Sequence, residues 1–262
     1  MQLEGCVAVL TGAGRKRSVG AATARLLAKR GCHILINCLK SEEQATSVVE
    51  ACRKEGVDAQ LFLGDLTNAT TCQHLAHLVE QQWGRLDILV NCMGITKSVS
   101  YEKLEALNAD DFARLFSVNV TAPFLVTQAL APLLRASKSA ALVNISSAAG
   151  ISGKGSSIAY AAVKGAENTL TLALAQALSP DVRVNAVCPS FVDSSWWEET
   201  YAGRDEQYQG LIKKMCESNL LGRVLKPEDV ASAILAIIEN PSITGELIRL
   251  DAGAHVGIAN PK

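Results

Sequence analysis

Charged residues are scarce in this 262-residue chain, and neither sign dominates. They make up 19% of the residues and leave a formal net charge of −1, whereas hydrophobic residues reach 48%. Without an excess of basic residues the chain has no general attraction for a polyanion, so no nucleic acid partner is expected. The apolar content instead predicts a globular protein with a large core.

Signals for export and membrane insertion are also missing. Residues Met1–Gly5 lack the basic and apolar segments of a signal peptide. The chain contains no uncharged apolar run of membrane-spanning length, and the nearest stretch, Ile158–Leu178, contains Lys164 and Glu167. We therefore expect a cytoplasmic protein without membrane contact, and we interpret that stretch as a buried helix.

The eight cysteines show neither a C-x-x-C motif nor the spacing of metal ligands, and most lie within apolar runs. This usage is typical of reduced, packed thiols in a cytosolic protein. His74 and His77 could share a helix face, but no third ligand stands nearby. No metal site is predicted.

Short apolar runs alternate with helical patterns along the chain. The runs predict strands at 6–10, 34–36, 59–63, 86–90, 140–145, 182–187 and 247–250, with helices at 19–30, 41–56, 70–83, 108–137, 157–179 and 227–239. Continuously apolar strands between helices predict a doubly wound α/β fold, with a parallel sheet of about seven strands between two helix layers. We expect one domain over residues 1–262.

Two local features refine this scheme. Ser41 and Gln44 resemble a capping box at the start of the second helix. Pro123 and Pro132 are expected to bend the helix at 108–137.

Residues 188–219 form the one irregular region of this scheme. The stretch is long and polar and contains Trp196 and Trp197. Long loops in such folds are usually lids or binding loops, so we predict a substrate lid here. The two tryptophans would either stack on a substrate or pack the lid.

Polar residues follow the ends of the predicted strands. Because ligands of doubly wound sheets bind outside the carboxyl ends of the strands, these residues are expected to line one binding edge. They are Thr11-Gly12, Asn37, Asp65, Asn91, Ser146-Ser147 and Pro189-Ser190.

A glycine-rich turn, residues 11–20, joins the first predicted strand to the first helix. Glycines there let main-chain N–H groups approach a pyrophosphate, and the helix N-terminus favours the anion. We predict a dinucleotide site, with a simple tight turn as the alternative.

The end of the second strand is expected to select the nucleotide. An acid there would bond a ribose 2′-hydroxyl, whereas basic groups would receive a 2′-phosphate. The residue is Asn37, Lys40 follows, and Arg15-Lys16-Arg17 can reach the same pocket. We therefore favour NADP over NAD; a solvated basic loop is the alternative for these cations.

Tyr160 and Lys164 stand four residues apart in a predicted helix, so they emerge on one face. A phenol, with a pKa of roughly 10, is inert near neutral pH unless a neighbouring cation stabilises the phenolate. The pair therefore predicts a proton donor and acceptor, although solvated helices often carry the same spacing.

Together these motifs resemble the short-chain dehydrogenase/reductase family over essentially the whole chain, and most of all the bacterial 3-oxoacyl-acyl-carrier-protein reductases and related ketoreductases. The motifs are Thr11-Gly12, Asp65, Asn91-Cys92-Met93-Gly94, Asn119, Asn144-Ile145-Ser146-Ser147, Tyr160-x-x-x-Lys164 and Pro189-Ser190-Phe191-Val192. The resemblance implies a Rossmann fold, NAD(P)-dependent chemistry on CH–OH or C=O groups, and a homotetramer.

The resemblance also implies the catalytic roles. Tyr160 would be the acid in reduction and the base in oxidation, and Lys164 would lower its pKa and hold the nicotinamide ribose. Ser147, rather than Ser146, would bond the substrate carbonyl, and Asn119 would help hold a relay water. The implied cofactor-binding residues are Gly12, Arg15, Lys16, Ser18, Val19, Asn37, Asp65, Leu66, Asn91, Gly94, Tyr160, Lys164, Pro189, Val192 and Ser194.

Three departures from the family pattern stand out. The glycine turn is two residues longer than usual, with Ser18 in place of the middle glycine, as in the divergent enoyl reductases. Those enzymes place tyrosine and lysine seven apart, whereas Ser157 stands seven before Lys164 here, so carbonyl chemistry is expected. The other departures are Cys92-Met93 in place of Asn-Ala and Ser190 in place of the glycine after Pro189.

The expected reaction is NADPH-dependent reduction of a ketone or 3-oxoacyl group, with an acyl thioester among the candidate substrates. The alternatives are an NAD-dependent dehydrogenase of a secondary alcohol, sugar or steroid, and a non-catalytic dinucleotide-binding regulator. Helix 158–178 has few polar positions beyond the catalytic pair, so part of it is expected to pack against another copy of the chain.

Overall fold

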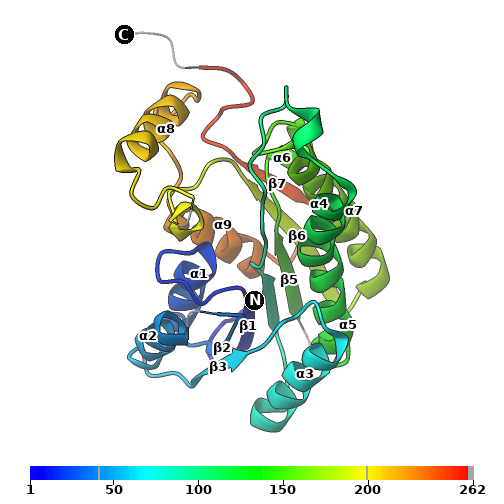
Figure 1. The fold of residues 1–262 in the computed structure, drawn as a ribbon. Helices are drawn as coiled ribbons and strands as arrows, with labels where there is room; N and C mark the ends of the chain where they lie inside the picture. Colours follow the sequence, from blue (N-terminus) through cyan, green and yellow to red (C-terminus); the bar gives the residue numbers. More distant parts are fainter. Residues whose placement is uncertain (41, 138, 199, 259–262) are drawn as a thin grey trace.

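The computed structural model of the chain describes residues 1–40, 42–137, 139–198 and 200–258 (Figure 1). Seven parallel strands form one sheet in the order β3-β2-β1-β4-β5-β6-β7. This order confirms the predicted doubly wound α/β fold. The strands are β1 (Val7–Thr11), β2 (His33–Cys38), β3 (Ala59–Leu63), β4 (Ile88–Asn91), β5 (Ala140–Ile145), β6 (Val182–Pro189) and β7 (Leu247–Leu250).

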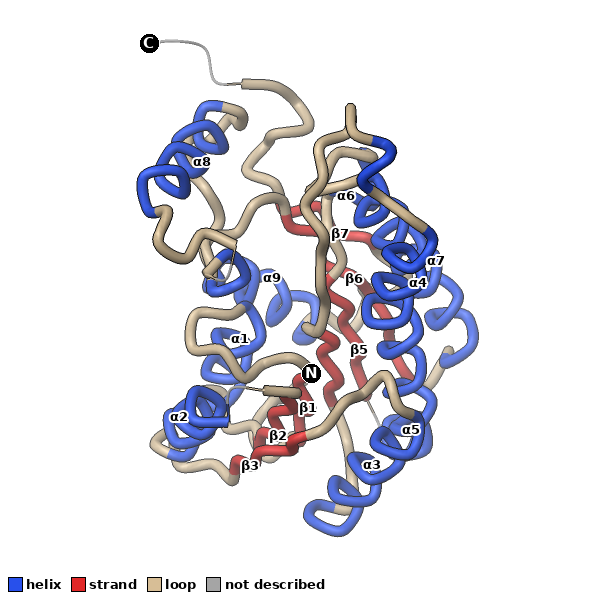
Figure 2. Tube along the Cα trace, viewed as in Figure 1, coloured by secondary structure: helices blue, strands red, loops and turns tan. Residues whose placement is uncertain are grey.

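Helices cover both faces of the sheet (Figure 2). Alternate residues of β1 enter different cores: Ala8 and Leu10 pack with one helix layer, Val7 and Val9 with the other. Both faces of the strand are therefore apolar, as a doubly covered parallel sheet requires. One layer contains α1 (Val19–Ala28), α2 (Glu42–Arg53) and α9 (Pro227–Glu239), and the other contains α3 (Ala69–Trp83), α5 (Ala122–Ala136) and α7 (Ile158–Leu178).

The predicted helix at 108–137 is a continuous helical run with a π-helical turn inside it. Helix α4 (Ala109–Phe116) leads through the π-turn η2 (Ser117–Thr121) into α5. The irregular turn therefore precedes both prolines, and Pro123 lies in the first turn of α5, where a missing N–H is tolerated. Such π-turns occur frequently at functional sites.

The run Ala109–Ala136 is long and apolar enough, by length and composition, to cross a membrane. The sequence analysis had placed the nearest such stretch elsewhere, at 158–178. Of the most apolar window in the run, 44% is buried inside the protein, and α5 contributes Val126, Leu130 and Leu134 to the core. A packed core helix meets the same criteria.

The stretch 188–219 is more regular than predicted. It contains the short 3₁₀ turn η3 (Ser195–Trp197) and the helix α8 (Asp205–Glu217), which stands apart from both helix layers (Figure 1). All α8 side chains are at least partly exposed, and the less exposed ones repeat at helical spacing, so the sequence does contain a signal for this helix: Tyr208, Leu211, Ile212, Met215 and Cys216.

The remaining short elements are the 3₁₀ turn η1 (Leu104–Ala106) and α6 (Ala149–Ser152). The predicted capping box depends on Ser41, which lies outside the described residues. Helix α2 ends at Arg53 and thus stops before Gly56, the predicted end.

Candidate active site

A chain of buried polar side chains links the carboxyl ends of β1, β4 and β5. Thr11 Oγ1 donates to Asn91 Oδ1 (3.4 Å), and Asn91 Nδ2 donates to Asn144 Oδ1 (2.9 Å). Asn144 Nδ2 then donates to Thr171 Oγ1 on α7 (2.9 Å). Parallel register places Thr11, Asn91 and Asn144 side by side, so the Asn91 carboxamide joins the ends of β1 and β5, and Asn144 ties them to α7.

Two serines follow β5, and only the second meets Tyr160. The Ser147 hydroxyl lies near the Tyr160 phenol and lowers its pKa, and both residues are half-buried. Ser146 is buried and donates to the main-chain oxygen of Lys164 (3.3 Å). Ser157 caps α7 by accepting from the Tyr160 N–H (3.1 Å), which fixes the helical turn that carries the phenol.

Lys164 is buried beneath the tyrosine with only 2% of its surface exposed. Its ammonium donates to the Ile145 carbonyl (3.0 Å) and to Glu167 Oε2 (2.6 Å), and lies 5.9 Å from the centroid of the Tyr160 ring. Burial opposes the charged form, but Glu167 and then Tyr160 raise the pKa of Lys164. The lysine is therefore held as an ammonium by a buried carboxylate.

The pKa of Tyr160 is raised in this structure, although Lys164 lowers it as expected. Burial of the phenol has the largest effect and raises the pKa. The Lys164 ammonium lowers the pKa, but the Glu167 carboxylate raises it again, and Ser147 lowers it to a smaller extent. Glu167 was not predicted as a site residue, although its position three residues after Lys164 places both on one helix face.

Asn119 lies in the π-turn and is fully buried. Its Nδ2 donates to the carbonyls of Ile95 (3.1 Å) and Leu115 (2.8 Å), and its Oδ1 accepts from the Ile95 N–H (3.4 Å). A Cβ atom on Gly94 would lie 2.9 Å from that oxygen, so a side chain there would displace it. The carboxamide thus clamps the loop after β4, and the relay water stays a prediction.

The glycine turn packs tightly on the ends of β2 and β4. Gly12 has φ +63°, and a Cβ atom there would lie 2.6 Å from the Cα of Met93. Its N–H donates to Asn37 Oδ1 (3.4 Å), while Asn37 Nδ2 donates to the carbonyls of Phe62 (3.3 Å) and Gly64 (3.1 Å). With 3% of its surface exposed, Asn37 braces the strands, and its side chain does not stand open at the nucleotide edge as expected.

Cys38, the last residue of β2, is also buried, with 5% of its surface exposed. A Cβ atom on Gly14 would lie 2.6 Å from the Cys38 Cβ, so β2 packs against the glycine turn at this residue. The strand extends two residues beyond the predicted end at Ile36. Neither Asn37 nor Cys38 supplies the carboxylate that would favour a free ribose 2′-hydroxyl.

Two of the three cations in the turn reach the stretch 188–219. Arg15 donates to the Ser195 carbonyl (3.0 Å), and Arg17 pairs with Asp193 (2.9 Å). The Ser195 N–H also donates to the Arg17 carbonyl (3.1 Å). The longer turn therefore bridges to the predicted lid, while Lys16 is exposed beside α2, where its N–H donates to Gln44 Oε1 (3.3 Å).

A pyrophosphate fits the start of α1. The Ser18 hydroxyl accepts from the Ala21 N–H (3.0 Å) and so caps the helix. The N–H groups of Val19 and Gly20 have no acceptor within a helix, and with the helix dipole they favour an anion. These groups, together with the close packing of Gly12 and Gly14, can hold the phosphates of a dinucleotide.

The other residues predicted to touch the cofactor serve local structure as well. Exposed Asp65 accepts from the Thr67 N–H (2.9 Å) and hydroxyl (2.7 Å). Buried Ser194 accepts from the Trp196 N–H (3.4 Å). Leu66 and Pro189 are buried, and Val192 pairs with Leu225 as an isolated bridge.

The two neighbouring tryptophans take different positions. Trp197 stacks on Phe191 with ring centroids 5.2 Å apart, and its indole N–H donates to the Val192 carbonyl (3.2 Å). The Trp196 ring instead lies against Gly94 and 6.5 Å from the Tyr160 ring. Trp197 therefore packs the stretch 188–219, and Trp196 faces the candidate catalytic tyrosine.

Comparisons with known proteins agree with this geometry. A family profile described as enoyl-(acyl carrier protein) reductase matches residues 12–255. The 3-oxoacyl-(acyl-carrier-protein) reductase of Thermotoga maritima is 32% identical over 262 residues, which cover 97% of this chain and 99% of the relative.

Solved structures of similar size superpose closely. A protein of Burkholderia xenovorans described as a short-chain dehydrogenase/reductase has a TM-score of 0.88 and 35% identity, covering 97% of this chain and 99% of its own. An NAD⁺-bound xylitol dehydrogenase has a TM-score of 0.86 and 26% identity. A short-chain dehydrogenase of Burkholderia cenocepacia in complex with NADP has a TM-score of 0.84 and 28% identity. Each of these two superpositions covers 97% of this chain and all of the solved chain.

Proposed function

Because the chain belongs to the short-chain dehydrogenase/reductase family and is an NAD(P)-dependent oxidoreductase, we propose that it reduces a ketone or 3-oxoacyl group to a secondary alcohol with NADPH. The observation that carries this proposal is the placement of Tyr160 next to Ser147 and above buried Lys164, at the carboxyl edge of the sheet. The four-residue spacing of tyrosine and lysine supports carbonyl rather than enoyl reduction, although the family profile carries the enoyl description.

When bound, NADPH supplies a hydride to the carbonyl carbon. The Ser147 hydroxyl orients the carbonyl oxygen and stabilises its developing negative charge. Tyr160 gives that oxygen its phenolic proton, since its phenol lies beside Ser147. Lys164 lies below the phenol, and the Ile145 carbonyl and Glu167 fix the position of its ammonium.

The choice of NADPH is supported by charge at the nucleotide edge. Lys16 and Lys40 are exposed near the end of β2, where Asn37 and Cys38 bring no negative charge. The likeness to an NAD⁺-bound xylitol dehydrogenase supports the alternative, an NAD-dependent alcohol dehydrogenase.

One assay distinguishes the proposed function from its alternatives. Turnover rates with NADPH and with NADH are compared over a panel of cyclic ketones, 3-oxoacyl thioesters and enoyl thioesters. We expect carbonyl reduction with NADPH. A tenfold or greater preference for NADH would refute the cofactor assignment, and turnover of enoyl thioesters alone would refute the reaction. NADPH binding with no turnover across the panel would favour a non-catalytic regulator.

The region 188–219 is proposed as a substrate lid, with Trp196 as the wall of the substrate site. Trp196→Ala is expected to raise KM for a cyclic ketone about tenfold with little loss of stability, because the ring faces Tyr160 and Gly94. Trp197→Ala is the matched control. It removes the stack on Phe191 and should cost about 2 kcal/mol of stability. Equal effects of both variants on KM and on melting temperature would contradict these separate roles.

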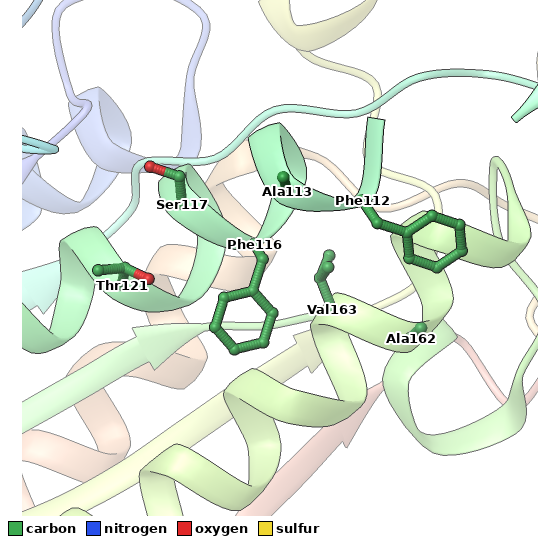
Figure 3. A pocket seen from close by; sticks show the side chains of 7 residues that line it. All are labelled: Phe112, Ala113, Phe116, Ser117, Thr121, Ala162 and Val163. Atoms are coloured by element: carbon green, nitrogen blue, oxygen red, sulfur yellow. The ribbon is translucent and has the colours of Figure 1, made fainter. Parts of the chain in front are cut away.

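We further propose that the enzyme is a homotetramer, assembled in part through the outer surface of α4 and α7. An open groove of ≈ 480 Å³ lies there, lined mainly by apolar residues (Figure 3). Phe112, Phe116 and Phe124 are each about 40% exposed or more, and so large an apolar surface is typical of an interface. The groove lining is Phe112, Ala113, Phe116, Ser117, Thr121, Ala162 and Val163.

Light scattering tests this assembly. Phe116→Glu is expected to shift the protein from tetramer towards smaller species, because a carboxylate would be buried in the interface. Leu221→Glu, at an exposed position on another surface, is the control and should leave the mass unchanged. A monomeric wild-type protein would overturn the proposal.

We place the enzyme in the cytoplasm. All eight cysteines are free thiols, and six of them are buried. Burial raises the pKa of several, among them Cys32 to about 12 and Cys52 to about 11. Such thiols suit a reducing compartment.

A further inference from the structure

Glu167 is a buried carboxylate whose place in the fold is not explained by packing. Glu167 is fully buried, and Lys164 has only 2% of its surface exposed. The distance between Lys164 Nζ and Glu167 Oε2 is 2.6 Å. Within the described residues Glu167 Oε1 has no hydrogen-bond partner. A half-satisfied buried ion pair is generally less stable than apolar side chains of the same volume, so stability alone does not account for the carboxylate.

We propose that Glu167 is a positioning residue that holds Lys164 and balances its charge, so that Tyr160 stays a protonated acid and the site favours carbonyl reduction over alcohol oxidation. The inference rests on the proposed function for its consequence in catalysis. The arrangement of the three residues does not depend on any substrate, since Lys164 contacts both Glu167 and the Tyr160 ring.

The charge balance gives the direction of the effect. With Glu167 ionised and Lys164 protonated, the buried pair is neutral, and ionising Tyr160 leaves a net negative charge in the core. Without the carboxylate, loss of one proton takes the same site from a positive charge to neutrality. The second process is easier in a medium of low dielectric constant, so the site loses its proton at lower pH when Glu167 is neutralised.

The other ionisable groups that face this site do not change the balance. Cys92, after β4, and Cys188, in β6, both interact with the Lys164–Glu167 pair. Burial raises the pKa of Cys92 to about 12 and that of Cys188 to about 11, so both thiols are neutral near pH 7. Tyr160, Lys164 and Glu167 therefore decide the charge of the site. Burial of the phenol and the Glu167 carboxylate both raise the pKa of Tyr160.

The test measures ionisation of Tyr160 without any substrate. The chain has four tyrosines, so the ultraviolet absorbance of phenolate is titrated in the wild type and in Tyr160→Phe, and the difference isolates Tyr160. We expect Tyr160 to ionise above its ordinary value of about 10 in the wild type. In Glu167→Gln the midpoint should fall by about one to two pH units, and in Glu167→Asp, which keeps the charge, it should fall by much less.

Activity provides the second measurement. Oxidation of the alcohol product needs phenolate, so its rate rises with pH, and this rise should move to lower pH in Glu167→Gln by the same interval. A Tyr160 that ionises well below pH 8 in the wild type would overturn the inference, even if the variant does not fold. An unchanged midpoint in folded Glu167→Gln would overturn it too. Absence of turnover with a shifted phenol midpoint would refute the proposed function and leave the role of Glu167 intact.

Discussion

Replacing Tyr160 by phenylalanine is expected to lower kcat by about 10²–10⁴-fold, the usual contribution of a positioned general acid. The substitution removes the hydroxyl group next to Ser147 and leaves the ring in contact with Trp196 and Lys164. The carbonyl oxygen would then have no proton donor of suitable geometry. The measurement is steady-state NADPH consumption with a ketone found active in the substrate panel.

Tyr201→Phe is the matched control for that experiment. Its ring also lies in an aromatic cluster, 6.3 Å from Trp197, and phenylalanine keeps this contact. Both variants should melt within a few degrees of the wild type and bind NADPH with similar affinity. If Tyr160→Phe turned over as fast as Tyr201→Phe, the proton donor would have to be another group.

Lys164→Met is expected to lower the free energy of unfolding by about 3–5 kcal/mol, the cost of leaving one member of a buried ion pair without its partner. Glu167 is fully buried, and among the described residues Lys164 is its side-chain partner, so the carboxylate would have to take up a proton or remain charged in the core. Burial raises the pKa of the Glu167 carboxyl, so the folded variant keeps this proton to a higher pH than the unfolded chain does. The free energy of unfolding should therefore fall further as pH rises. Urea unfolding at several pH values measures both effects.

The double variant Lys164→Met, Glu167→Leu supplies the control. It replaces the ion pair by apolar side chains of similar volume, and such replacements are often neutral or stabilising. We expect it to regain most of the lost stability while remaining inactive, because Lys164 also orients the tyrosine and the cofactor ribose in the proposed mechanism. Recovery of activity in the double variant, or equal stability of both variants, would show that the pair does not act as argued.

The sequence by itself determined the fold, and its motifs with the family resemblance predicted the acid–base pair. Continuous apolar strands between helices can only be buried by covering a parallel sheet on both faces, and the polar residues at the strand ends then share one edge. The four-residue spacing places Tyr160 and Lys164 on one helix face, whereas Ser147 was predicted from the resemblance. Helix α8 was not predicted although its apolar residues repeat at helical spacing, and the π-turn at Ser117–Thr121 lies inside a helical pattern that does not distinguish it.

Tertiary structure alone decided what surrounds that pair. Asn37 braces the strands and Cys38 packs against the glycine turn, because the strand runs two residues further than its apolar run. Arg15 and Arg17 turned to the stretch 188–219, and of two adjacent tryptophans only Trp196 faced the tyrosine. The sequence shows that Glu167 follows Lys164 by three residues, but only the structure shows that Glu167 is buried. The electrostatic effect of a charge depends on whether water can reach it, and exclusion of water is a property of the packed molecule.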